Sequence, residues 1–231
     1  MLTPLTLHSN VSCVNIGLMS EQASGHATYH HGDLRAALIK VASAEIERSG
    51  YENLSLRELA ASLGVSHAAP YRHFIDRRAL LAAVAAAGFD ELAAAHRKAA
   101  GRTPQARLTA AGRGYLAFAA ERPQLFRLML ASDLLSGATA PPDPALIKAA
   151  TACYEVFEGL VAATLDEPSD RAVKATAIAL MSSAYGFALL RMDNRLRPFM
   201  YGRLTQAELI DAVLSMQVNA RPRTTRHKRG R

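Results

Sequence analysis

Residues 54–74 of this 231-residue chain read LSLRELAASLGVSHAAPYRHF. Leucine and alanine recur at three- and four-residue intervals before the glycine, which predicts a short helix with one buried face. Ser55 and Glu58 form a Ser-x-x-Glu capping box at its start. Gly64 follows where the chain must turn, since glycine adopts a left-handed conformation without steric cost. A second helix capped by Ser66 would complete a helix-turn-helix, a motif that places a short helix against the DNA major groove.

Pro70 lies inside this second expected helix, as its fourth residue if Ser66 is the cap. Proline has no amide proton, so one early backbone hydrogen bond is lost there. That loss is tolerable near the amino end of a helix and severe later. We therefore expect the start of the second helix to be fixed within about a turn, with a slight kink.

Helical periodicity continues along the rest of the chain, and strand-like alternation is nowhere sustained. Further helices are expected at about 33–49, 76–98, 104–121, 122–130, 144–165, 168–192 and 205–218, with loops at 137–144 and 194–202. Gly88 is a weak point within one of them. The charged residues Glu45, Glu47 and Arg48 read as a solvated helix face. The sequence predicts an all-α fold of about nine helices.

Composition permits a sizeable core, because 50% of the residues are hydrophobic. The net charge of +7 belongs almost entirely to residues 221–231, which hold six Lys or Arg and no acid. Such a run is commonly disordered and solvated, although it could add salt-sensitive affinity for a polyanion. Residues 29–81 carry seven basic and six acidic side chains. DNA binding there must depend on the placement of a few side chains.

Several classes of protein are not favoured. There is no run of eighteen uncharged apolar residues, so we expect no membrane partner. Cys13 and Cys153 lie too far apart for a zinc motif, and a reducing cytoplasm suits them. Residues 1–28 show no sustained period and no signal-peptide pattern, so a disordered extension is expected, with Met1 or Met19 as the start. No catalytic spacing, phosphate loop or metal cluster occurs, which predicts a protein that is not an enzyme and has no cofactor or metal.

Three segments resemble the DNA-binding domain of the tetracycline-repressor (TetR) family. They are YHHGDLR at 29–35, the helix-turn-helix, and PYRHFIDRRALL at 70–81, and the likeness extends to about residue 90. ERPQLFRLM at 121–129 and MSSAYG at 181–186 resemble the effector domain of one subgroup. In that subgroup the second segment usually has Trp first and His-Gly last, where this chain has Met181 and Tyr185. The resemblance implies a DNA-binding domain at 29–81, an effector and dimerisation domain at 82–219, and a basic tail at 220–231.

The family resemblance also assigns DNA contacts. Early residues of the second helix of the motif would face the bases, and hydroxyl or basic groups would meet phosphates or the minor groove. The assigned residues are Tyr29, His30, Ser55, Ser66, His67, Ala68, Ala69, Tyr71 and Arg77. His67 can hydrogen-bond a base edge, and Arg77 stands where the family usually has a phosphate-contacting lysine. For His73 and Phe74 we expect core packing instead.

Aromatic and methionine side chains recur on consecutive helices of the second half. As a group they suggest a mainly apolar ligand with few polar anchors, although each could equally be plain core. They are Tyr115, Phe118, Phe126, Met129, Tyr154, Phe157, Met181 and Tyr185. The last two helices are the expected interface between two copies. Its residues are Met181, Ala184, Ala188, Leu209, Val213 and Met216.

These observations predict a one-component transcriptional regulator of the bacterial cytoplasm, acting as a repressor. It would bind a palindromic operator in double-stranded DNA as a homodimer and be released by a small, mainly apolar effector. The alternative is an architectural or nucleoid-associated DNA-binding protein without a small-molecule switch. The two differ in whether any ligand weakens DNA binding.

Overall fold

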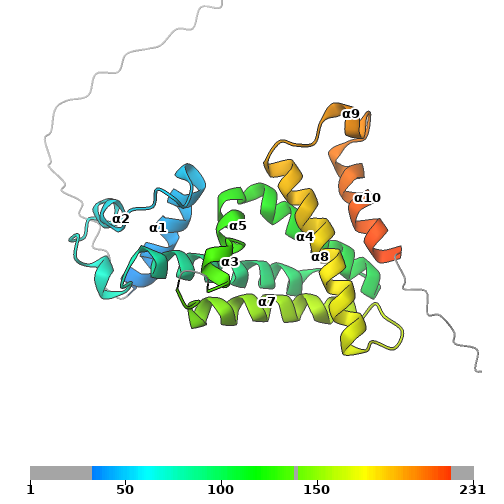
Figure 1. Cartoon of the computed structure of the whole chain (residues 1–231), viewed down its shortest axis with the longest axis horizontal. Helices are drawn as coiled ribbons and strands as arrows, with labels where there is room; N and C mark the ends of the chain where they lie inside the picture. The colour runs from blue at the N-terminus through cyan, green and yellow to red at the C-terminus, as the bar shows by residue number, and fades with distance from the viewer. Residues whose placement is uncertain (1–32, 138–139, 220–231) are drawn as a thin grey trace, which may run out of the picture. The chain divides into compact units, whose positions relative to one another are not determined.

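The computed structural model describes residues 33–137 and 140–219, and in this range every regular element is a helix (Figure 1). The prediction of an all-α fold is confirmed. The predicted extension 1–28, the DNA contacts Tyr29 and His30, and the basic tail 220–231 lie outside the described residues.

The first four elements include the helix-turn-helix region. They are α1 (Leu34–Ser49), α2 (Leu56–Ser62), the short 3₁₀ helix η1 (Pro70–Arg72) and α3 (Arg77–Lys98). The remaining elements are α4 (Pro104–Glu121), α5 (Pro123–Met129), α6 (Ser132–Leu135), α7 (Pro144–Ala162), α8 (Asp170–Met192), α9 (Pro198–Tyr201) and α10 (Gln206–Asn219). The short helix α9 lies inside the segment 194–202, for which the sequence predicts a loop.

Side-chain caps explain why most helix starts are readable from the sequence. Asp33 accepts a hydrogen bond from the Ala36 amide at 2.9 Å, and Asp76 accepts one from the Ala79 amide at 2.7 Å. Each bond satisfies an amide that has no partner within its helix. Further side-chain caps are Ser55, Thr103, Asp143 and Ser169.

The turn after α2 is a Schellman motif. Gly64 has φ +66°, the Val65 amide donates to the Ala60 carbonyl at 3.0 Å, and the Gly64 amide donates to Ala61 at 3.1 Å. This pair of bonds requires a left-handed residue, which glycine supplies. The predicted turn at Gly64 is confirmed.

The second helix of the motif differs from the prediction. Residues 67 and 68 form a turn in which the Ala69 amide donates to the Ser66 carbonyl at 2.9 Å. Pro70 is then the first residue of η1 and not the fourth residue of an α-helix. The reason is that proline suits the first helical position, where its missing amide proton has no partner to lose.

Phe74 and His73 have different environments although they are neighbours. Phe74 is buried in the core, as predicted, and the guanidinium of Arg35 lies 5.3 Å from its ring centre. His73 is exposed, so the expectation that it packs in the core is wrong. It follows η1 directly, and the turn there directs consecutive side chains to different sides.

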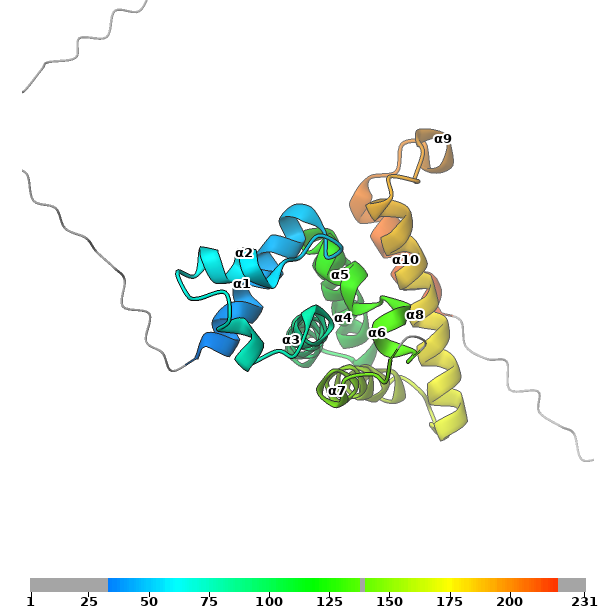
Figure 2. The ribbon, with the colours of Figure 1, turned by 60° about the vertical axis from the view of Figure 1, so that its left-hand side comes forward.

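Helix α3 is the central element of the core. It packs against α1, α4, α5 and α7, and both views show it beside α7 (Figure 2). Gly88 is the point of closest approach to α5, because a Cβ atom there would lie 2.6 Å from the Met129 sulfur. Gly88 therefore leaves room for the Met129 side chain, and a weak point in the helix at this glycine stays a prediction.

Helices α3 and α8 are each long and apolar enough to cross a membrane by length and composition alone. Core helices pass the same test, and 61% of the apolar window of α3 is buried inside the chain. The corresponding fraction for α8 is 33%. Residues 175–190 of α8 carry no charge. Within the described residues, much of the apolar stretch of α8 is therefore left uncovered.

Candidate functional site

The segment expected to face DNA is accessible. Ser66, His67, Ala68 and Tyr71 are exposed, and Ala69 is partly buried at the start of η1. The side chains come from a turn and a 3₁₀ helix, so their spacing differs from that of an α-helix. Their contacts with DNA stay a prediction.

Arg77 holds the start of α3 to the loop before α2. Its Nε donates to the Leu54 carbonyl at 3.0 Å, and a terminal nitrogen donates to the Tyr51 carbonyl. Ser55, next in the chain, accepts from the Glu58 amide at 3.5 Å as the cap of α2. Two of the three nitrogens of Arg77 therefore bind the protein itself. Phosphate contacts by Arg77 and Ser55 stay predictions.

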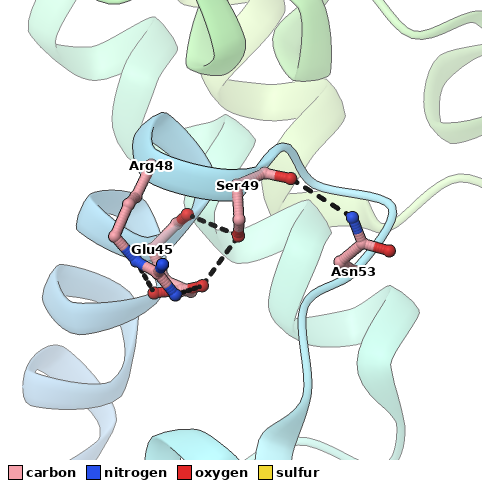
Figure 3. A network of polar contacts seen from close by, with 4 residues as sticks. All are labelled: Glu45, Arg48, Ser49 and Asn53. Carbon is pink, nitrogen blue, oxygen red and sulfur yellow. Dashed lines mark hydrogen bonds and ion pairs between the residues drawn. The ribbon is translucent and has the colours of Figure 1, made fainter.

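A polar network fixes the end of α1 and the loop that follows it (Figure 3). The Glu45 carboxylate accepts from Arg48 at 2.6 and 3.0 Å and from the Ser49 hydroxyl at 2.7 Å, and Asn53 donates to the Ser49 carbonyl at 3.3 Å. Hydrogen bonding by Arg48 lowers the pKa of Glu45. Arg48 is exposed, as predicted, whereas Glu45 is partly buried.

Glu47 links α1 to α5, which corrects its interpretation as part of a solvated face. Its carboxylate accepts from the amides of Gln124 at 3.2 Å and Leu125 at 2.8 Å, in the first turn of α5. A negative charge is favourable at that position because helix amides without partners point toward it. Arg122 adds a second link, donating to the Ser43 hydroxyl of α1 at 2.7 Å.

An apolar cavity of about 110 Å³ lies among α3, α4, α5, α7, α8 and α10. Six of the predicted effector residues line it: Tyr115, Phe126, Met129, Tyr154, Phe157 and Met181. The other two do not line it. Phe118 is buried in the core, and the Tyr185 ring packs on Phe126 with ring centres 6.1 Å apart.

Other lining residues were not among those assigned to the effector, although Ala184 was predicted for the dimer interface. They are Phe89, Leu92, His96, Leu108, Thr109, Gly112, Leu130, Ala150, Cys153, Leu180, Ala184 and Leu214. The signal for three of them was present, because Phe89, Leu92 and His96 recur at helical spacing on α3. A stripe of this kind does not distinguish a cavity wall from an ordinary core face.

Among the described residues that line the cavity, none is a Lys, Arg, Asp or Glu. Burial lowers the pKa of His96 to about 4, raises that of Cys153 to about 11, and raises that of Tyr115 well above its usual range. All three groups are therefore uncharged at neutral pH. The His96 and Phe157 rings lie 5.9 Å apart between their centres.

The residues expected to form a dimer interface lie in several environments. Ala184 and Ala188 are buried within the chain itself, and Leu209 and Val213 are partly buried against the same core. Met181 is 39% exposed and also lines the cavity, while the side chain of Met216 lies outside the described part. The exposed face of α8 instead carries Ala175, Ile178, Ala179 and Ser182.

Comparison with known proteins gives two family matches. Residues 38–84 match the model described as bacterial regulatory proteins, tetR family, and residues 108–216 match the tetracyclin repressor-like C-terminal domain. Together they cover well over half of the chain. The chain belongs to the TetR family. TetR-family proteins are transcriptional regulators that bind DNA through the helix-turn-helix domain, so the expectation of a regulator and not an enzyme is confirmed.

Solved structures share the fold of this chain. A protein of unknown function from Rhodococcus sp. RHA1 is 32% identical, with a TM-score of 0.67, over 83% of this chain and 96% of that one. Two TetR-family regulators share the fold. The one from Streptomyces coelicolor has 23% identity, a TM-score of 0.60 and coverage of 79% and 78%. PfmR from Thermus thermophilus has 21% identity, a TM-score of 0.55 and coverage of 80% and 99%. A search of curated proteins finds no significant match.

Proposed function

We propose that this TetR-family chain is a one-component repressor that binds a palindromic operator as a homodimer and is released by a small, mainly apolar ligand. The cavity carries this proposal: it is apolar, and α3 contributes to its wall. The same helix begins at Arg77, which is bonded to the loop before α2. A shift of α3 on ligand binding would therefore reach the helix-turn-helix.

Two features support a dimer: the exposed face of α8, and the need for two DNA-binding domains. One short reading segment contacts few base pairs, and a two-fold dimer reads two half-sites about one DNA turn, roughly 34–36 Å, apart. A second copy that packs on α8 would cover its apolar face. The same proposal includes a DNA-binding domain at about 29–81, an effector domain at about 82–219 and a cytoplasmic location. It also includes the likeness to the subgroup with the Trp and His-Gly pattern. In this chain Met181 and Tyr185 replace the Trp and the His of that pattern.

Selection of DNA fragments by the purified protein tests the DNA-binding half of the proposal. The selected sites should be palindromic. His67→Ala should change the preference at one base pair per half-site by about 1–3 kcal/mol if the contact is good. Tyr71→Phe is the matched control, because loss of a phosphate contact should weaken all sequences similarly. An unchanged motif in His67→Ala would remove the assignment of that residue.

The mutual effect of ligand and operator on each other's binding tests the proposed release by ligand. A ligand changes operator affinity only if it prefers one conformation, and operator must then weaken ligand binding by the same factor. The coupling is typically about 1–3 kcal/mol. Equal ligand affinity with and without operator, measured by calorimetry, would contradict the switch and favour the architectural DNA-binding alternative.

A further inference from the structure

His96 is the one buried polar or charged side chain among the described residues, and it lines the cavity. Only 5% of its surface is exposed. Its Nδ1 atom is fully buried and has no hydrogen-bond partner in the described part of the chain. A buried polar atom without a partner costs stability, so a side chain of this kind calls for an explanation.

The described surroundings of His96 offer it no ionic partner. None of the described residues lining the cavity is charged, and the ring lies beside that of Phe157 in a tilted arrangement. Burial alone lowers its pKa to about 4, so the imidazole is neutral at the pH of a cell. A neutral imidazole has one donor and one acceptor nitrogen.

We infer that His96 is the polar recognition group of the cavity and selects an uncharged, compact ligand with a single hydroxyl or comparable hydrogen-bonding group. This rests on the proposed function, since it assigns the chemistry of the same effector site. The cavity of about 110 Å³ is close to the volume of about 150 Å³ that holds benzene in an engineered protein. A one-ring alcohol or phenol has the required size and polarity. A carboxylate or ammonium would meet no opposite charge on the wall.

Phenol and toluene are suitable probes, because they have nearly the same shape and differ by a hydroxyl in place of a methyl group. We expect NMR titration to show that the wild-type protein binds phenol about tenfold more tightly than toluene, the size of one hydrogen bond. His96→Leu should lose that preference by binding toluene better and phenol worse. Leu92→Met is the matched control on the same wall of the cavity, and it should keep the preference because the swap conserves volume and adds no hydrogen bond.

A second measurement separates recognition from a structural role. Without ligand, His96→Leu should melt about 2–4 °C higher than wild type, because it removes a buried polar atom that has no partner. A histidine needed for packing would give a lower melting temperature. A lower melting temperature together with an unchanged preference for phenol would overturn the inference.

Ala150→Leu shows whether the probes occupy the cavity, because Ala150 is part of its wall. Both probes should lose affinity in this variant. Equal binding of phenol and toluene to wild type, abolished by Ala150→Leu, would overturn the role of His96 and leave the cavity as an effector site. Failure of both probes to bind wild type would overturn the inference and count against the proposed function as well.

Discussion

At the scale of single residues, Arg77 has a structural task that its position in the motif did not reveal. Its guanidinium donates to the carbonyls of Tyr51 and Leu54, which ties the start of α3 to the loop before α2. Arg77→Ala should lower the free energy of unfolding by about 2 kcal/mol, since two carbonyls lose a charged donor. Arg77→Lys should restore little of this free energy, because an ammonium does not reproduce the planar arrangement of donors in a guanidinium. Urea unfolding measures both. Unchanged stability with weaker DNA binding would show that phosphate contact is the main role of Arg77.

His96 gives a second prediction at this scale, on pH. The unfolded chain takes up a proton at the ordinary histidine pKa of about 6.5, whereas burial holds the folded group neutral down to about 4. The unfolded state therefore binds more protons in this window, and stability falls as the pH drops from about 6.5 to 4. His96→Leu should remove this component, which is at most about 3 kcal/mol. Chemical unfolding at several pH values measures the free energy of unfolding of both proteins. The same change of this free energy with pH in both would contradict the prediction.

At the scale of elements, Glu47 connects the helix-turn-helix region to a wall of the cavity. It caps the first turn of α5, and α5 also carries Phe126 and Met129 of the cavity lining. Glu47→Ala should speed hydrogen exchange at the Gln124 and Leu125 amides and lower the free energy of unfolding by about 1–2 kcal/mol. It should also reduce the effect of ligand on operator affinity.

Glu45→Ala is the matched control for this prediction. Glu45 lies on the same helix, but its bonds go to Arg48 and Ser49 within α1. We expect a loss of less than about 1 kcal/mol and unchanged exchange at the α5 amides, because a solvent-exposed pair contributes little. Equal effects of both substitutions would show that Glu47 acts through α1 alone.

The extent to which elements could be predicted follows from how local their causes are. The starts of α1 and α3 were readable because Asp33 and Asp76 cap them within three residues. The bond from Glu47 to Leu125 spans 78 positions, and nothing near Glu47 in the sequence indicates it. Only six of the eighteen residues lining the cavity were predicted, for the same reason. Aromatic side chains indicated several of the helices that line the cavity. The contact between His96 of α3 and Phe157 of α7 depends on the fold and has no signal in the local sequence.

At the scale of the whole molecule, the uncovered face of α8 predicts a homodimer. Ile178 is 52% exposed at the middle of this uncharged helix face. Ile178→Glu would place a charge in an apolar interface, so it should convert a dimer to monomer and weaken operator binding strongly. Ala95→Glu is the control, because it adds the same charge to an exposed position on α3. Light scattering at micromolar concentration distinguishes the outcomes, and a monomeric wild-type protein would contradict the prediction.

The room that Gly88 leaves for Met129 has a consequence for how relatives of this chain can diverge. The Met129 sulfur occupies the space that a side chain at position 88 would need, and Met129 is also part of the cavity wall. An alanine at 88 would require the Met129 side chain to shift, and a shorter residue at 129 would relieve the contact, so we expect the two positions to covary. Each such exchange would also reshape the cavity. Substitutions at these two positions would then change helix packing and effector preference together.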